Sequence, residues 1–122
     1  MSSRYSATVM EHFLEPRHRG AFEQPAGVGV SGVPGQGPFF IFQVCCRDGR
    51  VREARFQCHN CGVTVASGSI LTEMVEGQTL RECQAIDEES LAAALDGVPP
   101  DKRHMLHFVL SALNDAVTEA ME

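Results

Sequence analysis

The sequence has no hydrophobic run long enough to cross a membrane. A membrane-spanning helix needs about 20 consecutive apolar residues, and here polar residues, glycines or prolines interrupt every apolar run well before that length. The opening residues 1–4 are polar and lead directly into a helical pattern, which is unlike a signal peptide. We therefore expect a cytoplasmic protein with no membrane partner.

Positive charge is also scarce. The 10 Lys and Arg residues face 16 Asp and Glu residues, which leaves a formal net charge of −6. Nucleic acids favour clustered Lys and Arg because each phosphate carries a negative charge. The basic residues here are mostly scattered, and the short group at Arg17-His18-Arg19 follows a predicted helix end. The sequence thus argues against a general nucleic-acid-binding protein.

The cysteines do not form an obvious disulfide set. There are five of them, an odd number, and the expected compartment is reducing. The chain also lacks a second Cys-x-x-Cys step, so a zinc ribbon is not supported. Cys45 and Cys46 are neighbours in a predicted strand and therefore point to opposite faces. We therefore expect one of the two to pack in the core, where cysteine behaves as a small hydrophobic residue, and the other to be partly exposed. For Cys83 we likewise favour a packing role.

Length and pattern predict one small domain. A chain of 122 residues matches the usual size of a single domain, and it shows no internal repeat or linker. We expect residues 1–122 to form one α+β domain: a small three-stranded antiparallel meander with helices packed on one face. The predicted strands cover 27–31, 39–47 and 51–57, and the predicted helices cover 6–14, 63–76, 79–83, 88–95 and 101–121.

Two details of the predicted strands bear on function. In the third strand, strict alternation puts Val51 on the same face as Gln57 and opposite Phe56. In the first strand, Gly27-x-Gly29-x-x-Gly32 has the spacing of a dinucleotide-binding loop. It lacks the required strand–helix unit and the downstream acidic residue, so we reject a dinucleotide site.

The most conspicuous local motif is Cys58-His59-Asn60-Cys61, between a predicted strand and a predicted helix. A thiolate before a helix N-terminus is stabilised by the helix dipole and by unpaired N–H groups. The Cys-x-x-Cys spacing also lets two sulfurs reach one metal ion at Zn–S distances of about 2.3 Å. Metal binding, a dithiol redox pair and plain packing all remain open for this motif.

Several segments together resemble one known family. They are Tyr5-Ser6 followed by Glu15-Pro16-Arg17, the loop Gly32–Pro38, Ala54-Arg55-Phe56, Cys61-Gly62 with Ala66–Ser69, and Lys102–Met105. In this order they resemble scaffolds of the NifU/IscU type, which assemble iron–sulfur clusters. The resemblance spans almost the whole chain, and it implies the same α+β fold.

The resemblance also implies a ligand set that this chain has largely lost. The family holds a nascent cluster with three cysteines, an aspartate and a histidine. Position by position, only Cys61 and His104 are retained. Gln36 stands for the first cysteine, Pro38 for the aspartate and Met105 for the third cysteine. None of the three replacements is a thiolate or carboxylate ligand.

The retained residues define the expected site. By the resemblance, Cys61 accepts sulfur and binds metal, and His104 is a second ligand or a proton-transfer group. Cys58 is the candidate replacement ligand, and His59 and His107 are further candidate donors. The expected cargo is an iron–sulfur cluster or iron, with zinc as another metal that Cys and His ligands would hold.

We accordingly expect a scaffold or binding protein rather than an enzyme. The implied partners are a cysteine desulfurase and an Hsp70-type chaperone, the latter at Val98–Lys102, which resembles the family's Leu-Pro-Pro-Val-Lys segment. Two alternatives stay open. One is a relative that regulates or binds partners without a cluster, and the other is a thiol-disulfide oxidoreductase using Cys58 and Cys61.

Overall fold

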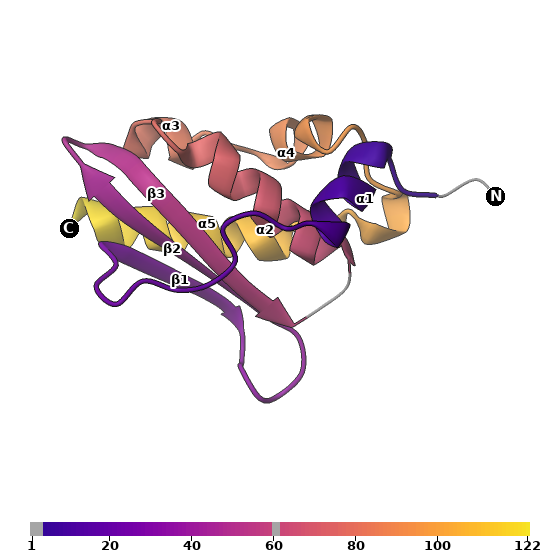
Figure 1. The fold of residues 1–122 in the computed structure, drawn as a ribbon, viewed down its shortest axis with the longest axis horizontal. Coiled ribbons are helices and arrows are strands. Elements are labelled where there is room, and N and C mark those ends of the chain that lie inside the picture. Colours follow the sequence, from indigo (N-terminus) through magenta and orange to yellow (C-terminus); the bar gives the residue numbers. More distant parts are fainter. Residues whose placement is uncertain (1–3, 60–61) are drawn as a thin grey trace.

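The computed structural model describes residues 4–59 and 62–122. They form a three-stranded antiparallel sheet in the order β1-β2-β3, with helices on one of its faces (Figure 1). The elements are α1 (Ala7–Leu14), β1 (Gly27–Gly32), β2 (Phe39–Arg47), β3 (Arg50–His59), α2 (Gly62–Val75), α3 (Leu80–Gln84), α4 (Glu88–Ala94), η1 (Pro100–Lys102) and α5 (His104–Met121). This confirms the predicted α+β meander. None of the described helices is long and apolar enough to cross a membrane.

Two helices cover the inner face of the sheet. α5 packs across β1 and β2, and α2 packs across β3, while α1 lies on the outer side of α2. The core between these layers contains the stacked rings of Phe40, Phe42 and Phe56, whose centroids lie 5.9 Å (Phe40–Phe56) and 6.1 Å (Phe40–Phe42) apart. Full burial of such a side chain stabilises the fold by about 1.5–3 kcal/mol. Gly68 of α2 lies directly against two of these rings, so α2 can approach the sheet closely.

The chain between α1 and β1 runs beside β3, the edge strand on that side. A parallel bridge joins Arg19 to Phe56, and the backbone N–H of Gly20 donates to the carbonyl of Phe56 at 2.8 Å. This segment therefore forms hydrogen bonds with some of the backbone groups that β3 would otherwise leave unpaired at the edge of the sheet. No helix covers the other, outer face of the sheet in the described parts of the chain (Figure 1).

A β-bulge corrects one expectation about β3. The register slips between Cys45 and Cys46, because Cys45 pairs with Glu53 while Cys46 pairs with Val51. Arg52 is thus an extra residue in β3, and a bulge of this kind shifts the alternation of side chains. Val51 is buried on the helix-facing side, so its predicted place on the face of Gln57 was wrong.

β1 and α5 approach each other closely because β1 carries glycines on its inner face. A Cβ atom on Gly29 would lie 1.7 Å from the carbonyl oxygen of Ala112, and one on Gly27 would lie 1.9 Å from that of Ala116. At the next inward position, the Ser31 hydroxyl donates to the carbonyl of Phe108 at 2.6 Å. The Gly-x-Gly spacing therefore serves helix–strand packing.

We predict that Gly29→Ala destabilises the protein by about 3 kcal/mol or more, because a methyl group there meets helix backbone that cannot move aside. Val30→Ala, on the opposite face of the same strand, is the matched control and should cost less than about 1 kcal/mol. Urea unfolding of both variants measures the difference. Equal stability of the two would contradict the close packing.

Candidate functional site

The family-equivalent positions that the structure describes gather at one end of the sheet. Along β1 the contacts with α5 move from Ala116 to Phe108, so α5 runs antiparallel to β1. Four further helix residues cover about 6 Å, or about two strand residues. This brings His104, the first residue of α5, level with the start of the loop 33–38. Phe39 pairs with His59, so β2 and β3 meet at the same end.

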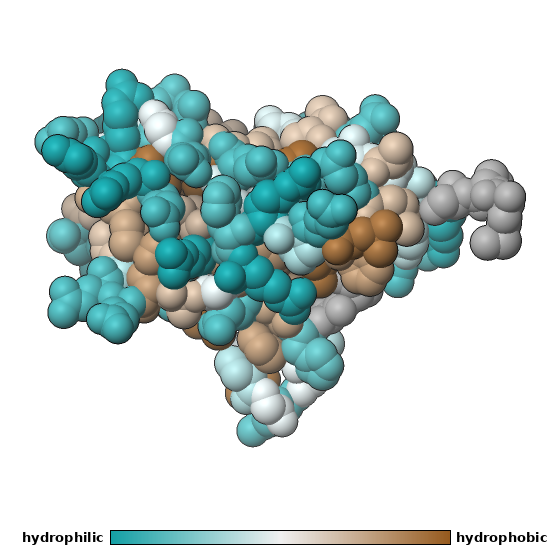
Figure 2. Space-filling model, viewed as in Figure 1, coloured by the Kyte–Doolittle hydropathy of each residue, from teal (hydrophilic) through white to brown (hydrophobic). Residues whose placement is uncertain are grey.

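The replaced positions are mostly exposed. Gln36 and Pro38 lie in the exposed loop between β1 and β2, which projects from the molecule (Figures 1 and 2). His104 is exposed, and Met105 beside it is half-buried and packs against the core. Cys61, the expected sulfur acceptor, lies outside the described residues.

Cys58 lies on the inner face of β3. Its relative exposure is only 9%, like that of the other buried residues that alternate along this strand. Its carbonyl oxygen accepts a hydrogen bond from the Arg19 guanidinium at 3.4 Å. Cys58 is not in a disulfide. Its thiol is thus directed into the core at the sheet end rather than outward with Gln57 and His59.

The two further histidine candidates have different neighbours. His59 is exposed at the end of β3, and its ring lies 6.4 Å from that of Phe39. His107 is exposed on α5, and its Nε2 lies 2.7 Å from a carboxylate oxygen of Glu88 in α4. His107 is therefore already engaged by a carboxylate on the flank of the helix.

The donor set does not fit a conventional cluster. Within residues 4–59 and 62–122, no three His, Cys, Asp or Glu side chains lie close enough together to share a metal ion. The amide of Gln36 and the thioether of Met105 are weak neutral donors, and Pro38 has no side-chain donor. Iron–sulfur clusters are held by thiolates. The described residues alone would therefore not hold one.

The remaining cysteines lie away from this end of the sheet. Cys46 is half-buried against the core, and burial raises the pKa of its thiol. Cys83 is fully buried in α3, and burial raises its pKa to about 11. A thiol with a raised pKa is a poor nucleophile. Their placement agrees with the packing role expected from the sequence.

A buried polar network anchors α1 to α2, and the sequence analysis did not identify it. The ring of His12 is 4% exposed, and its Nδ1 lies 2.7 Å from the hydroxyl of Ser69. The backbone N–H of Arg17 donates to the same hydroxyl at 2.8 Å, and the His12 Nε2 lies 3.6 Å from Glu73. A signal was present, because His12 follows the buried Val9 by three residues and so shares its helix face.

Comparisons with known proteins agree with this architecture. Residues 4–121 match the family described as the NifU-like N terminal domain. The chain is 34% identical over 115 residues to "Iron-sulfur cluster assembly scaffold protein IscU 1" of Archaeoglobus fulgidus, covering 94% of this chain and 75% of the relative. It is also 34% identical over 119 residues to the IscU scaffold protein of Escherichia coli strain K12, covering 94% and 92%.

A solved structure shows the same fold. The N-terminal part of a nitrogen-fixing NifU-like protein from Brucella abortus superposes with a TM-score of 0.74 at 16% identity, covering 95% of this chain and 93% of that one. The three-stranded sheet with its helices is therefore the fold that this neighbour also has.

We predict that His12 makes the protein less stable in acid. Burial and then the Arg17 charge lower the pKa of His12 from its ordinary 6.5, although Glu73 and Glu11 oppose the shift. The folded state thus binds the proton more weakly than the unfolded chain, so this contribution is present above pH 6.5 and lost as pH falls below it. Urea unfolding between about pH 5 and 8 should show the loss. His12→Gln should flatten the profile, and the exposed His59→Gln should not. An unchanged slope in His12→Gln would disprove this assignment.

Proposed function

Because the chain belongs to the NifU-like N-terminal domain family, we propose that it works in iron–sulfur cluster assembly as a scaffold-type protein and not as an enzyme. The observation that carries this proposal is the match to named scaffold proteins, at 34% identity over 115 residues and in the same order along the chain. The family match extends over residues 4–121. We propose that cluster assembly would take place at the end of the sheet where the described family-equivalent positions gather.

Sulfur acceptance at Cys61 is the central step of this proposal. The donor is a persulfide on a cysteine desulfurase. The Cys61 thiolate attacks the outer sulfur, a new S–S bond forms, the donor's S–S bond breaks, and the donor's cysteine leaves as a thiolate. In sequence Cys61 directly precedes α2, whose first residue is Gly62. The N-terminus of a helix favours negative charge, which supports a thiolate at that position.

This chain has fewer metal-binding side chains at the ligand positions than the family pattern has. His104 is exposed at the start of α5, and we propose that it binds an arriving metal ion together with Cys61. With a glutamine, a proline and a methionine at the other positions, this pair leaves a cluster short of ligands. We therefore propose a labile cluster, an iron ion, or a cluster completed by donors from another molecule. Zinc is the alternative metal for this Cys/His pair.

The chaperone segment is available for binding in this structure. Val98 and Pro99 are half-buried, while Pro100 and Asp101 are exposed in the short helix η1. Asp101 also pairs with Arg4, which ties the start of the described chain to this segment. Exposure of Pro100 supports the proposed contact with an Hsp70-type chaperone.

Two other functions were open from the sequence. A relative that binds partners without a cluster is favoured by the absence of a three-donor group among the described side chains, and it is the second candidate. The oxidoreductase alternative loses its structural basis. Its thioredoxin-like arrangement needs a parallel βαβ unit, whereas β2 and β3 are antiparallel and the Cys58 thiol faces the core.

We predict that a cysteine desulfurase supplied with cysteine adds one sulfur atom to the wild-type protein. Mass spectrometry of the intact protein and its peptides should place that sulfur on Cys61, because Cys61 directly precedes α2 in the sequence. Cys61→Ser should abolish the addition, whereas Cys58→Ser is the matched control and should retain it, because the Cys58 side chain is buried. Sulfur on neither residue, with partner binding intact in Cys61→Ser, would favour the second candidate.

We also predict that restoring the donors creates stable cluster binding. The triple variant Gln36→Cys, Pro38→Asp and Met105→Cys supplies the thiolates and carboxylate that the family uses. After anaerobic reconstitution with iron and sulfide, the triple variant should keep its visible absorbance through gel filtration. The wild-type protein should lose most of it. A wild-type cluster as stable as that of the variant would show that other donors compensate.

A further inference from the structure

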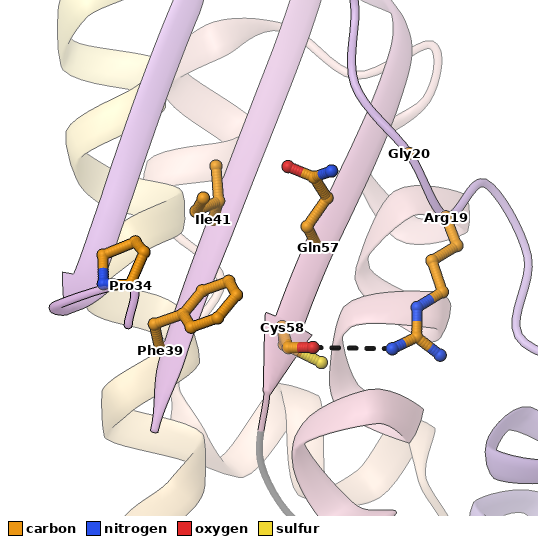
Figure 3. Close-up of a pocket in the computed structure, with 7 residues that line it drawn as sticks. All are labelled: Arg19, Gly20, Pro34, Phe39, Ile41, Gln57 and Cys58. Atoms are coloured by element: carbon orange, nitrogen blue, oxygen red, sulfur yellow. Dashed lines mark hydrogen bonds between the residues drawn. The ribbon is translucent and has the colours of Figure 1, made fainter. Parts of the chain in front are cut away.

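A pocket on the outer face of the sheet is not explained by sulfur or metal chemistry. It has a volume of about 500 Å³ and lies where β2 and β3 approach the segment after α1 (Figure 3). Its lining combines the apolar side chains of Phe39, Ile41 and Pro34 with the polar groups of Arg19 and Gln57, and Gly20 and Cys58 complete it. No acidic residue contributes to this lining in the described chain.

Arg19 supplies a positive charge that the rest of the described chain leaves unpaired. Its guanidinium donates one long hydrogen bond, of 3.4 Å, to the Cys58 carbonyl (Figure 3). Arg55 on the neighbouring strand, by contrast, has a carboxylate partner in Glu53 at 3.3 Å. An exposed guanidinium beside an apolar wall matches a carboxylate that arrives attached to an apolar body.

The apolar wall continues from β2 onto β1. Val30, Ile41 and Gln57 are partners in register across β1, β2 and β3, so they lie in one row on the outer face. Val30 is 44% exposed, and Val33 just beyond β1 is 53% exposed, which is unusual among the large apolar residues of this chain. The row spans two strand spacings, or about 10 Å, which is about three residues of an extended peptide.

The charge distribution favours binding of an acidic partner segment to the outer face of the sheet. Residues 1–59, which include the sheet, carry seven Lys and Arg and five Asp and Glu, a net charge of +2. Residues 62–122, which include the helices behind the sheet, carry three and eleven, a net charge of −8. Such asymmetry steers an anionic surface toward the sheet and away from the helices.

We propose that the outer sheet face docks a segment of a partner protein in which apolar residues are followed by a carboxylate. The apolar side chains lie along Val30, Ile41 and Phe39, and the carboxylate pairs with Arg19. Gln57 provides a further hydrogen-bonding group beside the carboxylate. The proposed contacts do not include Cys61 or His104, so they can be tested separately from the sulfur and metal chemistry proposed for those two residues.

The test uses the full chain, labelled with ¹⁵N and with ¹³C in its methyl groups, and three short peptides. Acetyl-Leu-Phe-Glu-amide carries both chemistries, acetyl-Leu-Phe-Gln-amide replaces the carboxylate by an isosteric amide, and acetyl-Ser-Ser-Glu-amide lacks the apolar body. NMR titration should place the shifts of the first peptide at the Arg19 Nε–H, the Gln57 side-chain amide and the Ile41 methyl groups. Both other peptides should bind about tenfold more weakly, the Gln peptide because it loses the charge-assisted contact and the Ser-Ser peptide because it loses the apolar contact.

Variants distinguish a specific pairing of Arg19 with the peptide carboxylate from non-specific electrostatic attraction. Arg19→Gln should weaken the Leu-Phe-Glu peptide about tenfold and leave the Leu-Phe-Gln peptide unchanged. Arg81→Gln, an exposed arginine on α3, is the matched control and should change neither. Ile41→Ser should weaken both peptides alike.

Four results would overturn the proposal. The first two are equal binding of the Glu and Gln peptides and chemical-shift changes that map to another surface. The other two are displacement of the peptide by inorganic phosphate as readily as by unlabelled Leu-Phe-Glu peptide, and self-association of the chain that Arg19→Gln removes. Phosphate displacement would indicate a simple anion site, and self-association would indicate a second copy as the occupant.

Discussion

The packing of α5 directly on the backbone of β1 is the constraint on which the arrangement of this molecule depends. No side chain of β1 separates the strand from the helix at Gly27 and Gly29, and the Ser31–Phe108 hydrogen bond continues the contact. Because helix and strand are held at backbone distance along several residues, neither can slide or tilt without a steric clash. The start of α5 and the loop after β1 are consequently fixed at the same end of the sheet.

This constraint explains how the chain keeps its fold while the ligand positions have changed. Gln36 and Pro38 lie in an exposed loop, so their side chains contribute little to the core. Met105 is half-buried, and a thioether suits such a position because it is apolar and adaptable. Fold stability and donor chemistry therefore reside in different residues. The same fold can carry either a complete or an incomplete set of cluster ligands. Which of the two a chain has depends on the side chains at the ligand positions.

Much of the fold was predictable because the apolar periodicity changes clearly from two to 3.6 along the chain. The strand predicted at 39–47 coincides with β2, and the helix predicted at 88–95 differs from α4 by one residue. The error at Val51 arose from the bulge opposite Cys45 and Cys46, which inserts one residue without any turn-forming signal in the sequence. Likewise, the role of Gly29 depends on a helix more than 70 residues away in the sequence. No local pattern reports such a contact.

The site was predictable only where a rule of alternation or a family pattern applied. His104 came from the resemblance, and the structure places it at the loop end of the sheet by geometry that is independent of the resemblance. The inward direction of Cys58 followed from its place two residues after Phe56, since alternate strand residues share a face. No sequence pattern indicated the Arg19 pocket. It forms where a loop residue meets the face of the sheet that no described helix covers. The outer face of the sheet combines the positive charge of Arg19, which has no carboxylate partner among the described residues, with exposed apolar side chains. A partner docked there would contact the face of the sheet opposite the helix layer that carries His104.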